Sequence, residues 1–222
     1  MTLIVHNMEQ GSAEWFAARA GKATASEFST VLAKGEGKTR RTYLLKLAGE
    51  ILTGQPMENY TNVHMERGKE QESDARDRYA LLHMDGNAEP VNVGFLEETD
   101  TRCGASPDAL IGDLGMLEIK SALPHILIEK LIRGEFPPEH KAQTQGGLWV
   151  AKREWIDLAI HCPKLPLFVK RSHRDEKYIA DLASAVAVFN IELDETVERV
   201  RRYGAPSALK GNLETSLVLM AG

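Results

Sequence analysis

Two acidic residues and a lysine near the middle of the chain have the types and the spacing of a hydrolytic metal site. Asp108 lies in the segment SPDAL, and Glu118 and Lys120 lie in the segment LEIKSA. Both segments are short apolar runs typical of strands, and the glycine-containing turn between them would bring Asp108 near Glu118. Because side chains alternate along a strand, Glu118 and Lys120 share one face. Buried carboxylates need a cation, and oxygen ligands favour a hard divalent ion such as Mg²⁺, to which the carbonyl of Ile119 could add a ligand.

The same pattern also occurs in an ordinary surface hairpin that carries an ion pair, so the spacing alone leaves both interpretations open. The elements around these strands decide whether the three side chains can be buried together. Apolar residues recur with a helical period in several segments, which we expect to be helices: 13–20, 24–32, 39–53, 62–84, 124–134, 139–151 and 174–203.

The period changes to two over Val91, Val93 and Phe95, which predicts a strand. Further short apolar runs predict strands at 108–111, 115–119, 155–161 and 167–170. We therefore expect an α/β (α+β) fold with one central mixed β-sheet flanked by helices. We place a single domain over 1–205 and a C-terminal tail over 206–222, whose apolar residues could dock on a neighbouring subunit.

Composition and charge exclude several classes of protein. The chain has 222 residues, of which 43% are hydrophobic and 27% are charged, as in an ordinary globular domain. Two cysteines cannot build a disulfide framework, and no run of about eighteen apolar residues is present. The N-terminus lacks the features of a secretory signal. We therefore expect a cytoplasmic protein without a membrane partner.

The net charge of −5 conceals an uneven distribution of charge along the chain. Residues 1–48 contain seven Lys or Arg against four Asp or Glu, whereas residues 58–118 contain five against fourteen. A basic region beside an acidic one is compatible with a phosphate-binding surface next to a metal pocket, and equally with unequal solvated helix faces.

Five motifs, in order, make the chain resemble the PD-(D/E)xK nuclease superfamily, and within it the phage lambda exonuclease group of YqaJ-type viral recombinases. The motifs are EQGSAEWFAARAGKATASE, RGKEQESDAR, CGASPDAL, LEIKSA and HKAQTQGGLWV. The resemblance runs from about Glu9 to the last helix. It implies a Mg²⁺-dependent exonuclease that processively digests the 5′-phosphorylated strand of linear double-stranded DNA to mononucleotides, leaving a 3′ single strand for recombination.

The resemblance also assigns catalytic roles to individual residues. It makes Asp108 and Glu118 the metal ligands and Lys120 the residue that orients or deprotonates the attacking water. It brings Glu72 from the charged helix to a second ion, so that two Mg²⁺ ions are expected, with Mn²⁺ able to substitute. From its own sequence context Glu72 is undistinguished, because its helix carries several other acidic residues.

A second group of residues is assigned to DNA by the same resemblance. Arg19, Ser26, Ser106 and Gln143 match positions that hold the 5′-phosphate, and Met65 matches an apolar wedge that separates the strands. A guanidinium with hydroxyl and amide donors suits a terminal phosphate. Taken singly, Ser26 is equally a helix cap, Gln143 a surface amide and Met65 a packing residue.

Gln143 and Gln145, in the last motif, are two positions apart and cannot share a helix face, so we expect only one of them, Gln143, to reach DNA. We expect His140 of the same motif to be a surface residue. The family's minor-groove arginine has no clear counterpart. The basic residues that could contact phosphate in its place are Lys34, Lys38, Arg40 and Arg41.

The resemblance finally implies partners and alternatives. Family members form ring-shaped homotrimers around DNA and act with a single-strand annealing protein from the same operon, which implies a bacterial cell and a phage or prophage origin. One alternative is another PD-(D/E)xK nuclease of the RecB-like type, without the iron–sulfur cluster that needs four cysteines. The other alternative is a non-catalytic recombination accessory protein that binds DNA ends.

Overall fold

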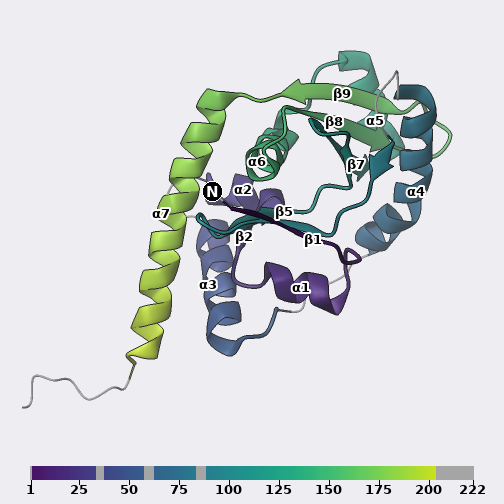
Figure 1. The fold of residues 1–222 in the computed structure, drawn as a ribbon. Helices are drawn as coiled ribbons and strands as arrows, with labels where there is room; N and C mark the ends of the chain where they lie inside the picture. The colour runs from purple at the N-terminus through teal and green to yellow at the C-terminus, as the bar shows by residue number, and fades with distance from the viewer. Residues whose placement is uncertain (1, 34–37, 58–62, 84–88, 204–222) are drawn as a thin grey trace, which may run out of the picture.

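The computed structural model describes residues 2–33, 38–57, 63–83 and 89–203, and within the third range it describes side chains from Glu72 to Leu82. The tail over 206–222 and the boundary at 205 lie outside the described residues and stay predictions. Figure 1 shows two sheets in the centre of the molecule with helices around them. The chain therefore has the mixed α/β class that its sequence predicts.

The two sheets replace the single sheet that the sequence predicts. A five-stranded sheet has the order β3-β6-β7-β8-β9, with bounds Pro90–Val91, Ala109–Ile111, Gly115–Ser121, Trp155–His161 and Phe168–His173. A four-stranded sheet has the order β1-β4-β5-β2, with bounds Leu3–His6, Phe95–Glu98, Cys103–Ala105 and Ala23–Thr24. Both sheets are mixed, because β7 pairs parallel with β8 and β2 pairs parallel with β5.

The prediction of a single strand over Val91, Val93 and Phe95 is wrong, because this segment contains parts of two strands. Val91 belongs to β3 of the larger sheet, whereas Phe95 begins β4 of the smaller one. The chain changes sheets at Gly94, where a Cβ atom would lie 2.4 Å from the carbonyl oxygen of Met8. The close approach of two backbones there requires glycine, and periodicity cannot reveal such an approach.

The helices agree closely with the segments predicted from apolar periodicity. Their bounds are α1 Ala13–Arg19, α2 Phe28–Val31, α3 Lys38–Thr53, α4 Val63–His83, α5 Pro124–Arg133, α6 Lys141–Ala151 and α7 Glu176–Arg201. The predicted helix at 24–32 is shorter, because Thr24 ends β2 and a 3-10 turn at Ala25–Glu27 precedes α2. Ser12 caps α1 by accepting a hydrogen bond from the backbone N–H of Trp15.

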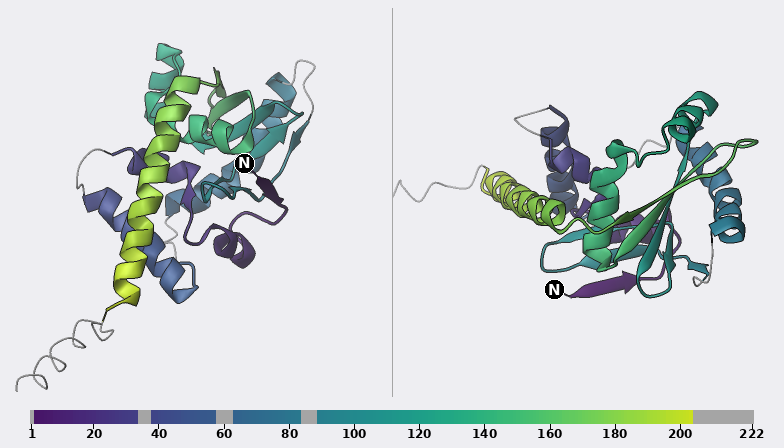
Figure 2. Two further views of the ribbon diagram at one scale, coloured as in Figure 1. Left: turned by 60° about the vertical axis from the view of Figure 1, so that its left-hand side comes forward. Right: turned by 90° about the horizontal axis from the view of Figure 1, so that it is seen from above.

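Two helices cover opposite faces of the larger sheet. In Figure 2, α4 lies on one face and α6 on the other. Alternation along β7 divides its side chains accordingly: Leu117 and Ile119 pack in a cluster with Ala75 of α4, whereas Glu118 contacts Gln143 of α6. The larger apolar core joins α6 to α3 and α7. Among the described helices, none is long and apolar enough to span a membrane.

The close packing of α6 gives a stability prediction. At Gly146 a Cβ atom would lie 2.2 Å from Cδ2 of the Phe28 ring, whereas at Gly147 it would lie 3.2 Å from the flexible end of Met116. We expect Gly146→Ala to lower the free energy of unfolding by about 2–3 kcal/mol, since overpacking a rigid core forces side chains off their rotamers. Gly147→Ala is the matched control and should cost less. Urea unfolding of both variants measures the difference, and equal midpoints would contradict this account of the packing.

Candidate active site

The hairpin of β6 and β7 brings the predicted acidic residues together. Asp108 precedes β6, and its backbone N–H donates to the carbonyl oxygen of Leu117 at 3.1 Å. Its carboxylate Oδ2 accepts from the backbone N–H of Ile119 at 2.5 Å. These two bonds hold the Asp108 side chain against β7, the strand that carries Glu118 and Lys120.

Glu118 is held by two donors on the α6 face of the sheet. Its Oε1 accepts from Nζ of Lys120 at 2.7 Å and from Nε2 of Gln143 at 2.5 Å. The residue is only 6% exposed. The prediction that Glu118 and Lys120 share one face of the strand is thus confirmed. As expected from their spacing, Gln143 and Gln145 point in different directions. Gln145 is buried and turned away, donating to Ser172 Oγ at 3.0 Å and to the carbonyl of His173 at 2.8 Å.

Electrostatics show that these groups form one centre. Burial, followed by the negative charges of Glu118 and Glu72, raises the pKa of Asp108 well above its ordinary value. Burial alone would lower the pKa of Lys120, but the charge of Glu118, with those of Asp108 and Glu72, outweighs it and raises the pKa. Lys120 is therefore an ammonium at neutral pH. Its single positive charge does not neutralise the three acidic residues, so a further cation would be bound favourably here.

The N-terminal part of the chain contributes a half-buried guanidinium. Arg19, at the end of α1, donates from Nη1 to Ser106 Oγ at 3.0 Å and from Nη2 to Thr24 Oγ1 at 3.4 Å. Its Cζ lies 4.0 Å from the centre of the Trp15 ring, whose Nε1 also donates to Ser106 Oγ at 3.0 Å. Burial lowers the pKa of Arg19 to about 10, which leaves it cationic at neutral pH. This cation is bound by neutral hydroxyl groups, so its charge is available to an anion.

One cavity of about 170 Å³ joins the guanidinium to the acidic centre. Its lining includes seven of the residues that the sequence singles out: Arg19, Ser26, Ser106, Asp108, Glu118, Lys120 and Gln143. Ser26 is exposed in the 3-10 turn, and its Oγ lies 3.3 Å from Thr24 Oγ1. The structure thus brings Arg19, Ser26, Ser106 and Gln143 to one cavity with three of the four expected catalytic residues, Asp108, Glu118 and Lys120.

Glu72 lies on the other side of Asp108. It lines a larger cavity, of about 500 Å³, that Asp108 also lines. Its Oε1 is 2.5 Å from Nη2 of Arg76, which donates in addition to the carbonyl oxygen of Asp108 at 3.3 Å. Met65 belongs to α4, but its side chain lies outside the described residues, so its role as a wedge stays a prediction.

Several residues of the site are not predictable from their own sequence context. Nε2 of Gln10 donates to the carbonyls of Val93 and Pro107, both at 2.9 Å, and so holds the segment before Asp108. Trp15 and Arg76 also act through partners far away in sequence. Trp15 lies in the first family motif and Arg76 in the second, and this placement is the only sequence signal that could have indicated them.

His140 departs from the expected surface position. It is partly buried just before α6, and burial together with the positive charge of Lys120 lowers its pKa to about 4. His140 is therefore neutral at pH 7 and lies near the catalytic centre. The sequence gives no signal for this burial, because it arises from the 3-10 turn Pro138–His140 that leads into α6.

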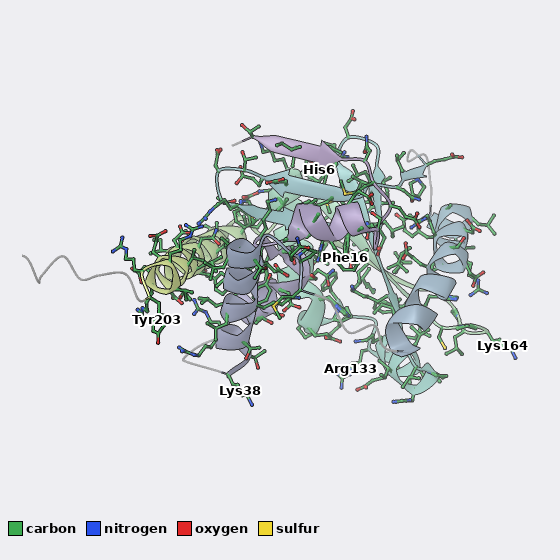
Figure 3. The ribbon with its side chains drawn as sticks, turned by 90° about the horizontal axis from the view of Figure 1, so that it is seen from below. His6, Phe16, Lys38, Arg133, Lys164 and Tyr203 are labelled. Atoms are coloured by element: carbon green, nitrogen blue, oxygen red, sulfur yellow. The ribbon has the colours of Figure 1, made fainter. Side chains whose placement is uncertain are left out.

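The basic residues near α3 differ in their availability to DNA. Arg40 forms a bidentate ion pair with Glu192 of α7, at 2.6 and 3.0 Å. Lys38 and Arg41 are exposed near the start of α3, where Figure 3 shows Lys38 pointing outward. Lys34 lies outside the described residues. Arg40 is thus committed to packing, and the exposed pair is the better candidate for phosphate contacts.

The donor set of the acidic centre fits a hard divalent ion. Among the residues that the structure describes, no three His, Cys, Asp or Glu side chains form a ready-made ligand cluster. Mg²⁺ does not need one, because it commonly takes one or two carboxylates and keeps several waters. Asp108 and Glu118 offer such a set, to which the carbonyl of Ile119, between Glu118 and Lys120 on β7, could add a ligand. Burial and, after it, repulsion from Glu118 and Glu72 raise the pKa of Asp108, and a cation would relieve that repulsion.

Two carboxylates and a lysine next to a cavity that Arg19 also lines form an arrangement suited to phosphodiester hydrolysis, which points to a nuclease as the class of protein. Comparison with known families specifies the class further. The chain belongs to the YqaJ-like viral recombinase domain family, whose model matches residues 14–154. The resemblance seen in the sequence motifs is thereby confirmed.

Solved structures agree with this assignment. The alkaline exonuclease LHK-Exo from Laribacter hongkongensis is 34% identical with a TM-score of 0.78, and the match covers 87% of this chain and 98% of that chain. LHK-Exo in complex with dAMP is 35% identical with a TM-score of 0.79 at the same coverage. A phage-related exonuclease from Haemophilus somnus 129PT, 14% identical with a TM-score of 0.56 over 81% of this chain and 96% of that chain, shares the fold. Among curated proteins, no sequence matches this chain.

Proposed function

We propose that the protein is a Mg²⁺-dependent exonuclease that digests the 5′-phosphorylated strand of linear double-stranded DNA in the 5′-to-3′ direction and releases mononucleotides. The observation that carries this proposal is the shared cavity of Arg19 and the acidic centre. An anion pocket beside a hydrolytic centre selects a substrate with a terminal phosphate close to the bond that is cut. The relative LHK-Exo was crystallised with dAMP, a deoxynucleoside monophosphate of the kind that such stepwise hydrolysis releases.

The residues of the chain divide the chemistry among them. Arg19, Ser106 and Ser26 bind the terminal 5′-phosphate, with Gln143 reaching the same cavity from α6. Asp108 and Glu118 would hold Mg²⁺, with the Ile119 carbonyl as a further ligand, and Glu72 would serve a second ion. When bound, such an ion would polarise the phosphate and favour the ionisation of water. Lys120 supplies fixed positive charge where the pentavalent phosphate gains negative charge.

We extend the proposal to the assembly and the partner. We infer a PD-(D/E)xK core, a ring-shaped homotrimer that encloses the DNA, and a single-strand annealing protein that loads on the exposed 3′ strand. These inferences are supported by membership of the viral recombinase family. A ring would hold DNA by topology, which makes processive digestion compatible with the acidic net charge of −5.

The decisive experiment incubates linear duplex DNA carrying 5′-phosphates with the protein and Mg²⁺. We expect mononucleotides to be released from the 5′ strand of the wild type and none from Asp108→Ala. Duplex that survives while the protein binds its ends would instead establish the accessory function without catalysis. Digestion from 3′ ends or internal cleavage would point to another branch of the nuclease superfamily.

The pocket around Arg19 makes a separate prediction. We expect Arg19→Ala to slow digestion of phosphorylated ends by about ten- to a hundredfold, because a charge-assisted hydrogen bond contributes about 1.5–3 kcal/mol. The variant should also lose most of the preference for 5′-phosphate over 5′-hydroxyl ends. Arg201→Ala, which removes an exposed arginine of α7, is the control and should leave both rates unchanged. Equal wild-type rates on the two kinds of end would refute the pocket.

A further inference from the structure

Between Glu72 and Leu82, the part of α4 whose side chains the structure describes, the helix buries few apolar side chains against the sheet. Among the described side chains of α4, the buried apolar ones are Ala75 and Tyr79, which are 0% and 1% exposed. Their cluster contains Leu117, Ile119 and Ala159 of the sheet. Two buried apolar side chains, one of them an alanine, give the helix little interdigitation with the strand residues, so among the described side chains apolar packing alone defines its position weakly.

Hydrogen bonds define the position of α4 on the sheet, which apolar packing alone defines weakly. The hydroxyl of Tyr79 donates to Oδ2 of Asp157 in β8 at 2.6 Å, and both residues are buried. A hydrogen bond to a buried carboxylate is both strong and directional, so it defines one position of the helix along β8. One turn before Tyr79, Arg76 donates to the Asp108 carbonyl at 3.3 Å and so ties the same face of α4 to the hairpin.

The acceptor in this contact is itself held rigidly. Arg171 of β9 binds Asp157 with two hydrogen bonds, from Nε to Oδ1 and from Nη2 to Oδ2, both at 2.8 Å. Its guanidinium stacks on Trp155, with Cζ 3.7 Å from the ring centre. A bidentate guanidinium pair fixes the plane of a carboxylate, so Asp157 offers Tyr79 an acceptor in a single orientation.

The spacing along α4 transmits this position to the acidic centre. Tyr79 follows Glu72 by seven residues, which is close to two helical turns of 3.6 residues, so the two side chains project from the same face. A shift of the helix at Tyr79 therefore becomes an equal shift at Glu72. We propose that the Tyr79–Asp157 hydrogen bond, held by Arg171, is a positioning device that sets the place of the Glu72 carboxylate beside Asp108.

This inference rests on the proposed function, since it assigns Tyr79 and Asp157 a part in the same reaction without contact with DNA. Tyr79→Phe removes one hydroxyl and keeps the ring. We expect kcat on phosphorylated duplex to fall about tenfold with KM changed by no more than about twofold, as for other residues that orient metal ligands. Calorimetric affinity for Ca²⁺, used as an unreactive probe of the protein without DNA, should also fall about tenfold. Tyr178→Phe in α7 is the matched control and should change neither quantity.

A double-mutant cycle with Glu72→Gln tests the mechanism. If Tyr79 acts through Glu72, then Tyr79→Phe should reduce kcat and Ca²⁺ affinity by no more than about twofold further in the Glu72→Gln background. Full multiplication of the two effects would overturn the proposal, as would a Tyr79→Phe protein that loses thermal stability but keeps wild-type kcat and Ca²⁺ affinity. If Tyr79→Phe does not fold by circular dichroism, Arg171→Gln replaces it in the same cycle, with a smaller expected loss of about threefold. A wild type that digests no duplex would reject the proposed function, and the Ca²⁺ cycle would then decide the positioning role alone.

Discussion

Asp108→Asn is expected to abolish digestion of phosphorylated duplex while leaving the fold intact. An asparagine keeps an oxygen that can accept from the backbone N–H of Ile119, so the contact that holds residue 108 against β7 survives. The negative charge that attracts the divalent ion is lost. Losing about 4 kcal/mol of charge stabilisation corresponds to about a thousandfold in rate. Single-turnover assays with Mg²⁺ measure this loss, and Asp113→Asn, in the exposed turn of the same hairpin, serves as the control.

The same substitution has an opposite effect on stability. Because the pKa of Asp108 is raised in the folded protein, its contribution to stability is complete below the ordinary value of 3.8 and is lost as the pH rises through the folded-state pKa. Above the folded-state pKa and without divalent ions, the ionised carboxylate therefore opposes folding. We expect Asp108→Asn to melt higher than the wild type in a chelator and Mg²⁺ to narrow the difference. A lower melting temperature for the variant in the chelator would contradict this electrostatic account.

Lys120→Gln is expected to lower kcat by about a hundred- to a thousandfold, the cost of removing one preorganised group that stabilises transition-state charge. The carboxylates around Lys120 raise its pKa and keep it an ammonium, which suits the role of a fixed charge. Affinity for phosphorylated ends should change little, because Arg19 provides that contact. Lys120→Arg keeps the charge with a different geometry and should recover part of the rate. A Lys120→Gln enzyme with near wild-type kcat and reduced end affinity would transfer Lys120 to the binding set.

The catalytic hairpin is predictable from sequence because its determinants are local. Asp108, Glu118 and Lys120 lie within thirteen consecutive residues, and the alternation of strand side chains together with one tight turn determines how they meet. Helical geometry likewise predicts that Gln143 and Gln145 point in different directions, since it separates residues two positions apart. The family resemblance is what selects Gln143 of the two. The family motifs then supply Arg19, Ser26, Ser106 and Glu72, which local physics alone does not distinguish.

The rest of the site depends on contacts between distant parts of the chain. Gln10 reaches Val93 and Pro107, and Tyr79 reaches Asp157, over separations that no periodicity encodes. The second sheet is missed for a related reason. Strand β1 at Leu3–His6 pairs only with β4, more than eighty residues away, and its own four residues lack a distinctive pattern. Register between distant strands is a property of the whole fold.

Ser106 and Asp108 are separated by a single proline, and this spacing has a consequence for the length of the product. Two residues of extended chain span about 7 Å at most, so a short backbone segment sets the distance between the phosphate pocket and the acidic centre. Gln10 holds the middle of this segment by donating to the carbonyl of Pro107. Under the proposed function, the backbone distance between Ser106 and Asp108 determines the size of each excised fragment. Fragment length should then be independent of salt, temperature and DNA sequence, and only an insertion between Ser106 and Asp108 should change it.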